Sequence, residues 1–384
     1  MIEKKSVLFI MPALPGGGAE KVLIDILRRF DRDRFQLTLL LLFRDDVYTS
    51  SIPDDVEVLY LHRRSTLNHE RFIRRLRMYG MYHGFVDWYY KPFVCRKLKG
   101  RRFDSIVSFM EGAAVRMHSF IMDKGDRNVS WVHIDLKTKH WSKDFFRSDY
   151  QERSIYEKMD GVAFVSDESR DKFIELFDYD KSNLTTIYNL IPRDEIRRAA
   201  AQKDVRKEKF MIVLVGRLNS QKRFDRAIDV AKKLREAGSD FEMRIIGEGE
   251  LRGDLECRIE KYGLAGIVKL LGFRKPPYPD MAIADLYLST SSSEGYPLTL
   301  CEALCLGLPV VSTKTSGPSE ILDDSRYGLL VDHDIDSIYN GVKRMIDDEE
   351  LRDMYRGQSE KRSRMFDVEA TMNRITEFIT GDCK

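Results

Sequence analysis

Two carboxylates stand at a spacing suited to chemistry in the segment SSSEGYPLTLCEALCLGLPVVST, residues 291–313, namely Glu294 and Glu302. The segment predicts an apolar strand end, a tight turn at Gly295, a helix with Pro297 at its first position, and another strand. The unpaired N–H groups and the dipole at such a helix start attract an anion. Two carboxylates beside an anion site are suited to binding hydroxyls next to a diphosphate. This pattern predicts a sugar-nucleotide pocket.

Two cations follow another expected strand. The strand FMIVLVG leads into Gly216, Arg217 and, five residues further on, Lys222. Open α/β sheets bind ligands beyond the carboxyl ends of their strands. Arginine offers a planar donor fork and lysine a compact charge, so this pair is suited to holding a diphosphate. The alternative is a solvated loop without a ligand.

A glycine loop follows the first expected strand. In SVLFIM…PALPGGGAEKVL, Gly16, Gly17 and Gly18 allow the backbone to approach a ligand before a helix opens at about Ala19. A dinucleotide fingerprint needs a third glycine where Lys21 stands, which argues against a nicotinamide cofactor. A strand-to-helix turn with no ligand is the alternative.

The segments VGRLNSQK, IIGEGELR and SSSEGYPLTLCEALCLGLPVVST, together with GGGAEKV, resemble the retaining glycosyltransferases of family 4. Members of that family have the GT-B fold, in which two Rossmann-like domains face each other across a cleft. The resemblance covers both halves of the chain. It implies transfer, with retention, of a hexose or N-acetylhexosamine from a nucleotide-diphosphate sugar, with UDP the expected nucleotide. The implied acceptor is a hydroxyl of a lipid-linked or growing surface saccharide, as in capsule or polysaccharide biosynthesis.

The resemblance also implies roles for individual residues. Arg217 and Lys222, after Gly216, would hold the diphosphate, and Glu302 would contact the nucleotide ribose. Glu294 would contact the hydroxyls of the donor sugar, as one of two residues assigned to catalysis. The other implied donor contacts lie at the helix start and in the first glycine loop: Tyr296, Pro297, Leu298, Thr299, Gly17 and Gly18.

Three residues of the N-terminal half complete the predicted site. His133 ends the strand VSWVHI, and the resemblance places a histidine near the donor sugar, so it is the second residue assigned to catalysis. A structural histidine is the alternative. Glu111 follows the strand DSIVSF and is either an acceptor contact or a cap of the next helix, with the cap favoured. Gly16 is assigned to the acceptor side with Glu111.

Alternative activities use the same residues differently. Glu294 and Glu302 resemble the acid and nucleophile of a glycoside hydrolase, but the tight strand-turn-helix context favours binding. A sugar-nucleotide epimerase of the same fold and a non-catalytic sugar-nucleotide-binding subunit also fit the pattern. No Asp-x-Asp triplet follows an apolar strand convincingly, so we expect no metal and no other cofactor.

The elements that must position these residues follow from length and pattern. A chain of 384 residues exceeds what one core usually supports, and β-rich runs alternate with helical patterns. We therefore expect two doubly wound α/β domains with parallel sheets. The expected division is an acceptor-side domain over 1–191, a nucleotide-sugar domain over 192–365, and a terminal helix over 366–384 able to pack on the first. Residues 192–209 are polar and predict a linker.

Composition limits the expected partners and cellular compartment of the protein. The formal net charge of +2 indicates no charged partner, and the five cysteines have no C-x-x-C spacing, which suits a reducing cytoplasm. No apolar run approaches the roughly 18 residues of a spanning helix. Between Arg63 and Arg102, however, twelve Lys or Arg face only Glu70 and Asp87, interleaved with aromatic residues.

This basic aromatic segment predicts a peripheral contact with an anionic membrane, at the inner face of the cell membrane. The same charges suit a polyprenyl diphosphate acceptor. The alternative is a solvated helical face over an ordinary core. No nucleic-acid motif accompanies the charge, so nucleic acid is not expected as a partner.

Overall fold

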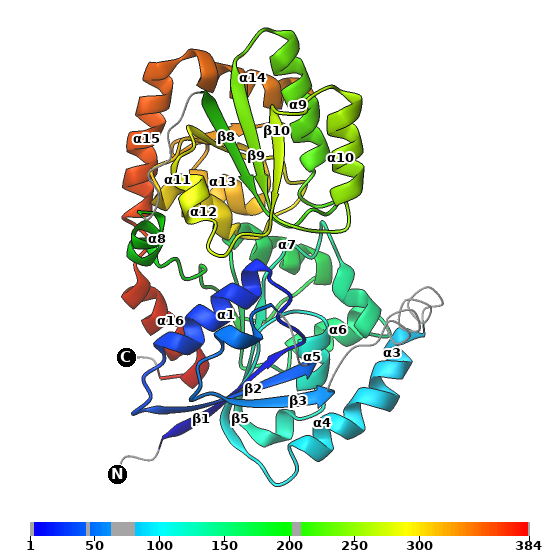
Figure 1. Ribbon diagram of the computed structural model, residues 1–384. Coiled ribbons are helices and arrows are strands. Elements are labelled where there is room, and N and C mark those ends of the chain that lie inside the picture. The colour runs from blue at the N-terminus through cyan, green and yellow to red at the C-terminus, as the bar shows by residue number, and fades with distance from the viewer. Residues whose placement is uncertain (1–3, 44–46, 63–80, 202–208, 383–384) are drawn as a thin grey trace. The chain divides into compact units, whose positions relative to one another are not determined.

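The computed structural model describes residues 4–43, 47–62, 81–201 and 209–382. The chain forms two compact units, the first Met1–Leu190 with Glu369–Lys384, and the second Ile191–Val368. Each unit is built on its own parallel sheet, of seven and six strands (Figure 1). The two parallel-sheet α/β domains expected from the alternating pattern are confirmed.

The described elements of the first unit are the following. Its strands are β1 (Lys5–Met11), β2 (Phe35–Phe43), β3 (Glu57–His62), β4 (Phe103–Ser108), β5 (Gly125–Val132), β6 (Gly161–Phe164) and β7 (Leu184–Thr186). Its α-helices are α1 (Gly18–Arg29), α3 (Tyr82–Phe85), α4 (Lys91–Lys97), α5 (Ala113–His118), α6 (Asp149–Tyr156), α7 (Asp167–Phe177) and α16 (Val368–Thr380). Shorter turns are η1 (Thr49–Ser51), the π-helical η2 (Val86–Tyr90), η3 (Met122–Lys124) and η4 (Trp141–Phe145).

The second unit has these described elements. Its strands are β8 (Phe210–Val215), β9 (Phe241–Ile246), β10 (Val268–Gly272), β11 (Leu286–Ser289), β12 (Val310–Thr313) and β13 (Leu329–Val331). Its helices are α8 (Arg193–Ala200), α9 (Phe224–Glu236), α10 (Arg252–Lys261), α11 (Tyr278–Ala282), α12 (Leu298–Cys305), α13 (Ser316–Leu322), α14 (Ile335–Asp347) and α15 (Glu349–Ser363).

The first sheet is buried on both faces because helices cover it on each side. On one face, Phe9 of β1 meets Phe30 at the end of α1, with ring centroids 5.9 Å apart. On the same face Trp131 of β5 meets Phe378 of α16 at 5.1 Å. The opposite face packs against α4, α5 and α7 in one apolar cluster. Successive strand residues point to opposite faces, so both faces need apolar residues and the strands read as continuous apolar runs.

Both sheets change winding direction at one place. The strand orders are β3-β2-β1-β4-β5-β6-β7 and β10-β9-β8-β11-β12-β13. The chain therefore leaves β1 and β4 in opposite directions, and likewise β8 and β11. In open α/β sheets the crevice at such a switch point, outside the carboxyl ends of the strands, is where ligands bind. The loops that follow these four strands carry most of the predicted site residues.

Two expectations about the second unit are corrected. The predicted linker contains the helix α8, which buries Ile196 completely and packs against α11 and α12. The Arg197 guanidinium also donates to the Cys305 carbonyl at 2.7 Å. A mostly charged helix thus packs on the domain through one apolar residue and one arginine. The strand β13 was not predicted. Its three residues are too few to show a strand period.

The helix α16 closes the first unit. The Arg374 guanidinium donates to the Thr186 carbonyl at 2.8 Å, and the Ser105 hydroxyl donates to the Ile379 carbonyl at 2.8 Å. The Phe378 ring lies where a side chain at Gly161 would stand, since a Cβ there would come within 2.6 Å of it. The last helix of the chain thus belongs to the compact unit of the first 190 residues.

Candidate functional site

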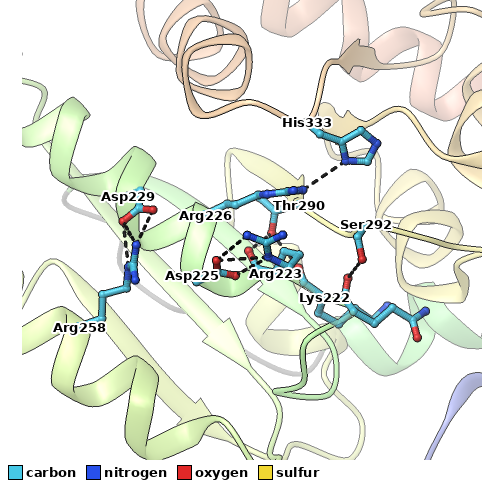
Figure 2. A network of polar contacts seen from close by, with 10 residues as sticks. Lys222, Arg223, Asp225, Arg226, Asp229, Arg258, Thr290, Ser292 and His333 are labelled. Carbon is cyan, nitrogen blue, oxygen red and sulfur yellow. Dashed lines mark hydrogen bonds and ion pairs between the residues drawn. The ribbon is translucent and has the colours of Figure 1, made fainter.

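The loops after β8 and β11 are joined by hydrogen bonds at the switch point of the second unit. The Thr290 hydroxyl donates to the carbonyls of Lys222 and Arg223 at 2.9 and 3.0 Å, and the Ser292 hydroxyl donates to the Gln221 carbonyl at 3.1 Å (Figure 2). The Gln221 side chain in turn donates to the Ser293 carbonyl at 2.9 Å. Two segments about 70 residues apart therefore form one rigid surface.

Lys222 and Glu294 face each other across this junction. The Lys222 ammonium lies 2.5 Å from Oε1 of Glu294, and the side chains are 19% and 9% exposed. The Ser291 hydroxyl donates to the same oxygen at 2.7 Å. Oε2 of Glu294 has no hydrogen-bond partner among the described residues. The pair presents one carboxylate oxygen and one ammonium, both largely desolvated, which strengthens their interaction with any ligand there.

Three glycines make this junction possible. A Cβ on Gly216 would lie 2.9 Å from the Lys222 side chain, which passes directly over it. A Cβ on Gly247 would lie 1.8 Å from the Gly216 carbonyl oxygen, and the φ of Gly247 is +148°. A Cβ on Gly317 would lie 2.5 Å from the Gly295 carbonyl oxygen. The loops pack backbone against backbone, so they have little freedom to rearrange.

Arg217 differs from Lys222 in its surroundings. Its side chain is exposed, and its guanidinium makes no hydrogen bond or ion pair within the described parts of the chain. An unpaired guanidinium at the carboxyl edge of a parallel sheet is available to an anionic ligand. The structure therefore places Gly216, Arg217 and Lys222 in the loop after β8, and of these Lys222 contacts Glu294.

The helix α12 begins one residue later than expected. Pro297 is its N-cap residue and Leu298 its first helical residue, because the backbone of Pro297 is extended. The N–H groups of Leu298 and Thr299 have no partner among the described residues, as expected for a helix start. The Thr299 hydroxyl lies 2.8 Å from the Tyr287 hydroxyl.

Glu302 lies on α12, five residues after its N-cap, and is 3% exposed. The Tyr278 hydroxyl donates to its Oε1 at 3.1 Å. Tyr296, between the glycine turn and the helix, is 7% exposed. The carboxylate is thus held by a neighbouring helix, α11, which the sequence did not associate with the site.

The glycine loop of the first unit follows β1, on one side of the other switch point. Gly16 has φ +103°, which favours glycine, and Gly17 is the N-cap of α1. The helix begins at Gly18, one residue before the predicted start. A Cβ on Gly17 would lie 2.2 Å from a carboxylate oxygen of Glu20, which is 6% exposed. The loop thus places a buried carboxylate at the start of α1.

His133 follows β5 and is 9% exposed, with its ring 4.9 Å from that of Phe109. Burial lowers the pKa of His133 to about 3, so the imidazole is neutral near pH 7. Its Nε2 is buried and has no hydrogen-bond partner in the described parts of the chain. A neutral imidazole with one unpaired nitrogen can exchange a hydrogen bond with a hydroxyl but does not supply positive charge.

Glu111 is 1% exposed and does not cap α5, so the favoured interpretation is wrong. The cap position is taken by Gly112, at φ +72°. The Glu111 carboxylate instead accepts from the backbone N–H of His133 at 3.0 Å and from the indole N–H of Trp141 at 3.1 Å. Burial raises the pKa of Glu111, against the effect of these two donors. Both oxygens face inward, because two N–H groups satisfy them there.

Within the described residues, no three His, Cys, Asp or Glu side chains come together as metal ligands do, and no helix is long and apolar enough to cross a membrane. The predicted independence of metal stays a prediction, as do the individual roles of the site residues. Comparisons with known proteins decide the family.

Both halves of the chain match glycosyltransferase families. Residues 16–195 match the model described as Glycosyltransferase Family 4, and residues 195–362 match Glycosyl transferases group 1. The two matches meet at residue 195 and together reach from the first glycine loop to α15. The chain belongs to the GT-B glycosyltransferases. The resemblance of the glycine loop and of the three later segments to GT-B glycosyltransferases is therefore confirmed, and retention of configuration stays a prediction.

Several relatives of this glycosyltransferase are known. A Campylobacter jejuni protein named as an N-acetylgalactosaminyltransferase acting on a diphospho-undecaprenol-linked sugar is 32% identical over 229 residues, which are 59% of this chain and 62% of that protein. The Escherichia coli protein WcaL, named as a putative colanic acid biosynthesis glycosyltransferase, is 37% identical over 129 residues, 31% of this chain and 32% of that one. The match thus spans less than two thirds of either relative.

Solved structures show the same fold. HepE of Anabaena, crystallised with UDP and glucose, aligns with a TM-score of 0.74 at 22% identity, over 98% of this chain and all of that one. At this identity the likeness shows that the chain has the GT-B fold.

Four positioning residues were missed in the sequence: Ser291, Gln221, Tyr278 and Trp141. The first two lie within motifs that were recognised, and their polar side chains at strand ends were the available signal. Tyr278 and Trp141 carry no such signal, because nothing in their local sequence connects them with Glu302 or Glu111.

Proposed function

We propose that this chain transfers a hexose or N-acetylhexosamine from a UDP-linked donor to a hydroxyl of a lipid-linked or growing surface saccharide, with retention of anomeric configuration. The observation that carries the proposal is the desolvated Lys222–Glu294 pair at the switch point of the second unit, beside the unpaired Arg217. The Anabaena protein that was crystallised with UDP supports the choice of nucleotide, and the Campylobacter jejuni relative supports a lipid-linked acceptor.

The charges fit the reaction. Breaking the bond between the anomeric carbon and the phosphate oxygen leaves positive charge on the sugar and negative charge on the diphosphate. Lys222 and the first N–H groups of α12 stabilise the departing diphosphate, because they are fixed before the reaction begins, and the exposed Arg217 adds a second positive charge. The acceptor hydroxyl forms the new bond to the same carbon, and its proton passes to an oxygen of the departing phosphate.

The carboxylates take binding roles in this proposal. Oε2 of Glu294 is available to a hydroxyl of the donor sugar, while Oε1 remains with Lys222 and Ser291. Glu302, held by Tyr278, binds the ribose. His133 exchanges a hydrogen bond with a sugar hydroxyl through its Nε2, which has no partner among the described residues. A metal or other cofactor takes no part, so chelation with EDTA should leave turnover unchanged.

A screen of donors tests the activity. The protein is incubated with UDP-, GDP- and ADP-linked glucose, galactose and their N-acetylamino forms, and release of the nucleotide and the configuration of the product are followed by NMR. We expect turnover of a UDP-sugar and an α product from an α donor. An epimerase would interconvert the donors with no acceptor present. A binding subunit would hold a donor without consuming it, and absence of binding to every donor would refute the proposal.

We further propose that the enzyme works in the cytoplasm, as a peripheral protein on the inner face of the cell membrane. Residues 63–80 of the basic aromatic segment, which include Arg71 and Arg77, lie outside the described residues. In the part that is described, Met81, Trp88 and Phe93 are 60%, 75% and 41% exposed. The neighbouring Lys91, Arg96 and Lys97 are exposed as well. Exposed aromatic residues between cations are suited to an anionic headgroup layer.

Vesicle sedimentation tests this contact. Replacing Trp88 and Phe93 by serine should release the protein from vesicles that contain phosphatidylglycerol. Tyr150→Ser is the matched control, because Tyr150 is 78% exposed but lies on α6, outside the segment. Equal sedimentation of wild type and the double variant, or equal loss in the control, would contradict the membrane contact.

A further inference from the structure

Trp141 is held in place by a buried carboxylate. Its indole N–H donates to Oε1 of Glu111 at 3.1 Å, and Glu111 is 1% exposed. The other oxygen of Glu111 accepts from the backbone N–H of His133, so the ring is tied to the end of β5. Hydrogen bonds to a carboxylate are stronger than neutral ones, and this one is shielded from water. The indole is therefore fixed in orientation although the residue is partly exposed.

The ring is also supported from behind. A Cβ at Gly112 would lie 3.1 Å from two ring carbons of Trp141, so any other side chain there would press against the ring. Phe145 meets the indole edge to face, with centroids 5.8 Å apart and planes at 86°. Gly112 has φ +72°, a conformation that glycine adopts readily. The backbone at the start of α5 is thus shaped around one aromatic ring.

The ring lies at the predicted ligand-binding edge of the first sheet. Glu111 and Gly112 follow β4, one of the two strands that flank the switch point, and His133 follows its neighbour β5. His133 provides an independent sign of a ligand, because the residue is more than nine-tenths buried and its Nε2 has no hydrogen-bond partner among the residues that the structure describes. A buried polar atom without a partner is uncommon unless a ligand or water completes it.

We propose that the indole of Trp141, oriented by Glu111, is a platform on which a sugar ring of the saccharide acceptor stacks. A pyranose has one face of C–H groups and a rim of hydroxyls. The flat indole suits the C–H face, and the unpaired nitrogen of His133 suits a hydroxyl. Glu111 contacts no sugar in this arrangement and acts as a positioning residue. The inference rests on the proposed function and names the residue that receives the acceptor.

Trp88 provides a contrast within the same unit. It is 75% exposed, and no polar group of the described residues holds its indole N–H. Its ring contacts are to Phe85 and Tyr89, at centroid distances of 6.3 and 6.2 Å. Trp88 is therefore the matched control for a tryptophan that is exposed but not fixed.

The test uses saturation-transfer difference NMR on the full-length protein without membranes. The probes are the methyl glycosides of glucose, galactose, N-acetylglucosamine and N-acetylgalactosamine. We expect saturation of the ring C–H protons of at least one probe by the wild type and by Trp88→Ala, and at least a fivefold weaker signal with Trp141→Ala.

Two further variants separate stacking from a structural role. Trp141→Phe loses the bond to Glu111 as Trp141→Ala does but keeps an aromatic face, so it should retain most of the signal. Glu111→Gln should reduce the signal about threefold, because the ring stays but is less well oriented. If Trp141→Phe and Trp141→Ala lose the signal equally, Trp141 supports the fold rather than the sugar, and the proposal fails.

The remaining outcomes are also decisive. No signal from any probe with wild type, or an unchanged signal with Trp141→Ala, overturns the platform. Donor turnover measured on the same samples keeps the two proposals apart. Turnover of a UDP-sugar together with a signal independent of Trp141 refutes the platform alone. A signal that depends on Trp141 without turnover of any donor refutes the transferase and leaves the saccharide site.

Discussion

The carboxyl edges of the two sheets, at their switch points, differ in the chemistry of their side chains. We call them the edge of the first unit and the edge of the second unit. The edge of the second unit carries full charges, with Lys222 and Glu294 paired at 2.5 Å and Arg217 exposed beside them. The edge of the first unit carries a neutral imidazole at His133 and an indole held by the inward-facing Glu111. Fixed charges suit a diphosphate, whereas an aromatic face and a neutral hydrogen-bonding group suit a sugar. We propose that the same sheet topology serves two kinds of recognition in this protein.

The largest expected effect is on stability, when alanine replaces a glycine in the loop after β9 of the second unit or in the loop after β1 of the first. Gly247→Ala should destabilise the second unit by about 3 kcal/mol or more, because its Cβ would lie 1.8 Å from a carbonyl oxygen and its φ is +148°. Gly16→Ala should cost only about 1 kcal/mol, since its Cβ would meet Val47 at an ordinary 3.5 Å and only backbone strain remains. Urea unfolding measures both.

Gly253→Ala is the control for this pair. It lies on α10 with nothing within 4 Å of its Cβ and should be neutral or slightly stabilising. Similar costs at Gly247 and Gly16 would show that the two edges are packed alike.

The next largest effect is expected when one charge of the Lys222–Glu294 pair is removed. Lys222→Met leaves Glu294, 9% exposed, without its cation, and should cost about 3 kcal/mol of stability. The double variant Lys222→Met/Glu294→Gln should regain part of that loss. Lys232→Met, whose partner Glu236 lies 3.7 Å away in an exposed pair, should change stability by at most about 0.5 kcal/mol. Equal losses of stability for Lys222→Met and Lys232→Met would show that the Lys222–Glu294 pair behaves like an ordinary exposed ion pair.

Variants of Glu294 and Glu302 should affect different steps, the first mainly turnover and the second mainly nucleotide binding. Glu294→Gln should lower kcat about 100-fold and change the Kd for UDP less than about threefold, since it removes a contact to the reacting sugar. Glu302→Ala should weaken UDP about tenfold, because it removes a ribose contact. Steady-state kinetics and calorimetry on both variants provide the comparison. The reverse pattern would exchange the two roles.

Acid should affect the first unit more than the second. Burial lowers the pKa of His118 to about 4 and of His133 to about 3, below the unfolded value of 6.5. The unfolded chain therefore takes up these protons first, and stability is lost as the pH falls below about 6.5. Each fully titrating histidine contributes a slope of about 1.4 kcal/mol per pH unit.

His140 opposes this trend. Burial lowers its pKa, but the hydrogen bond to Glu152 and the charges of Glu152 and Asp149 together outweigh burial and raise the pKa. The stabilisation from His140 is therefore present at low pH and lost as the pH rises. Hydrogen exchange from pH 7.5 to 5 should show the first unit opening earlier, and His118→Gln should reduce that difference. Uniform loosening of both units would contradict the assignment.

Local sequence pattern was sufficient to predict every described strand except β13, and to predict the charged residues at the carboxyl edge of the second sheet. Continuous apolar runs located β1 and β8, and glycines and cations at strand ends identified the segments around Gly216 and Glu294. The pairing of Lys222 with Glu294 joins residues 72 positions apart, so no local pattern reveals it.

The first unit was harder to predict for the same reason. A carboxylate after a strand resembles a cap or a ligand contact, and only the three-dimensional structure shows that Glu111 faces inward to His133 and Trp141. Charged edges depend on residue type, which the sequence displays. Neutral edges depend on which side chains are buried, and the sequence does not display burial.

Calorimetric titration of UDP is the most direct test of the central claim, that the second edge holds a nucleotide diphosphate. Wild type should bind UDP with one site, Arg217→Ala should bind about tenfold more weakly without loss of stability, and Trp141→Ala in the other unit should bind as wild type does. Absence of UDP binding to wild type, or equal binding by Arg217→Ala, would contradict the account.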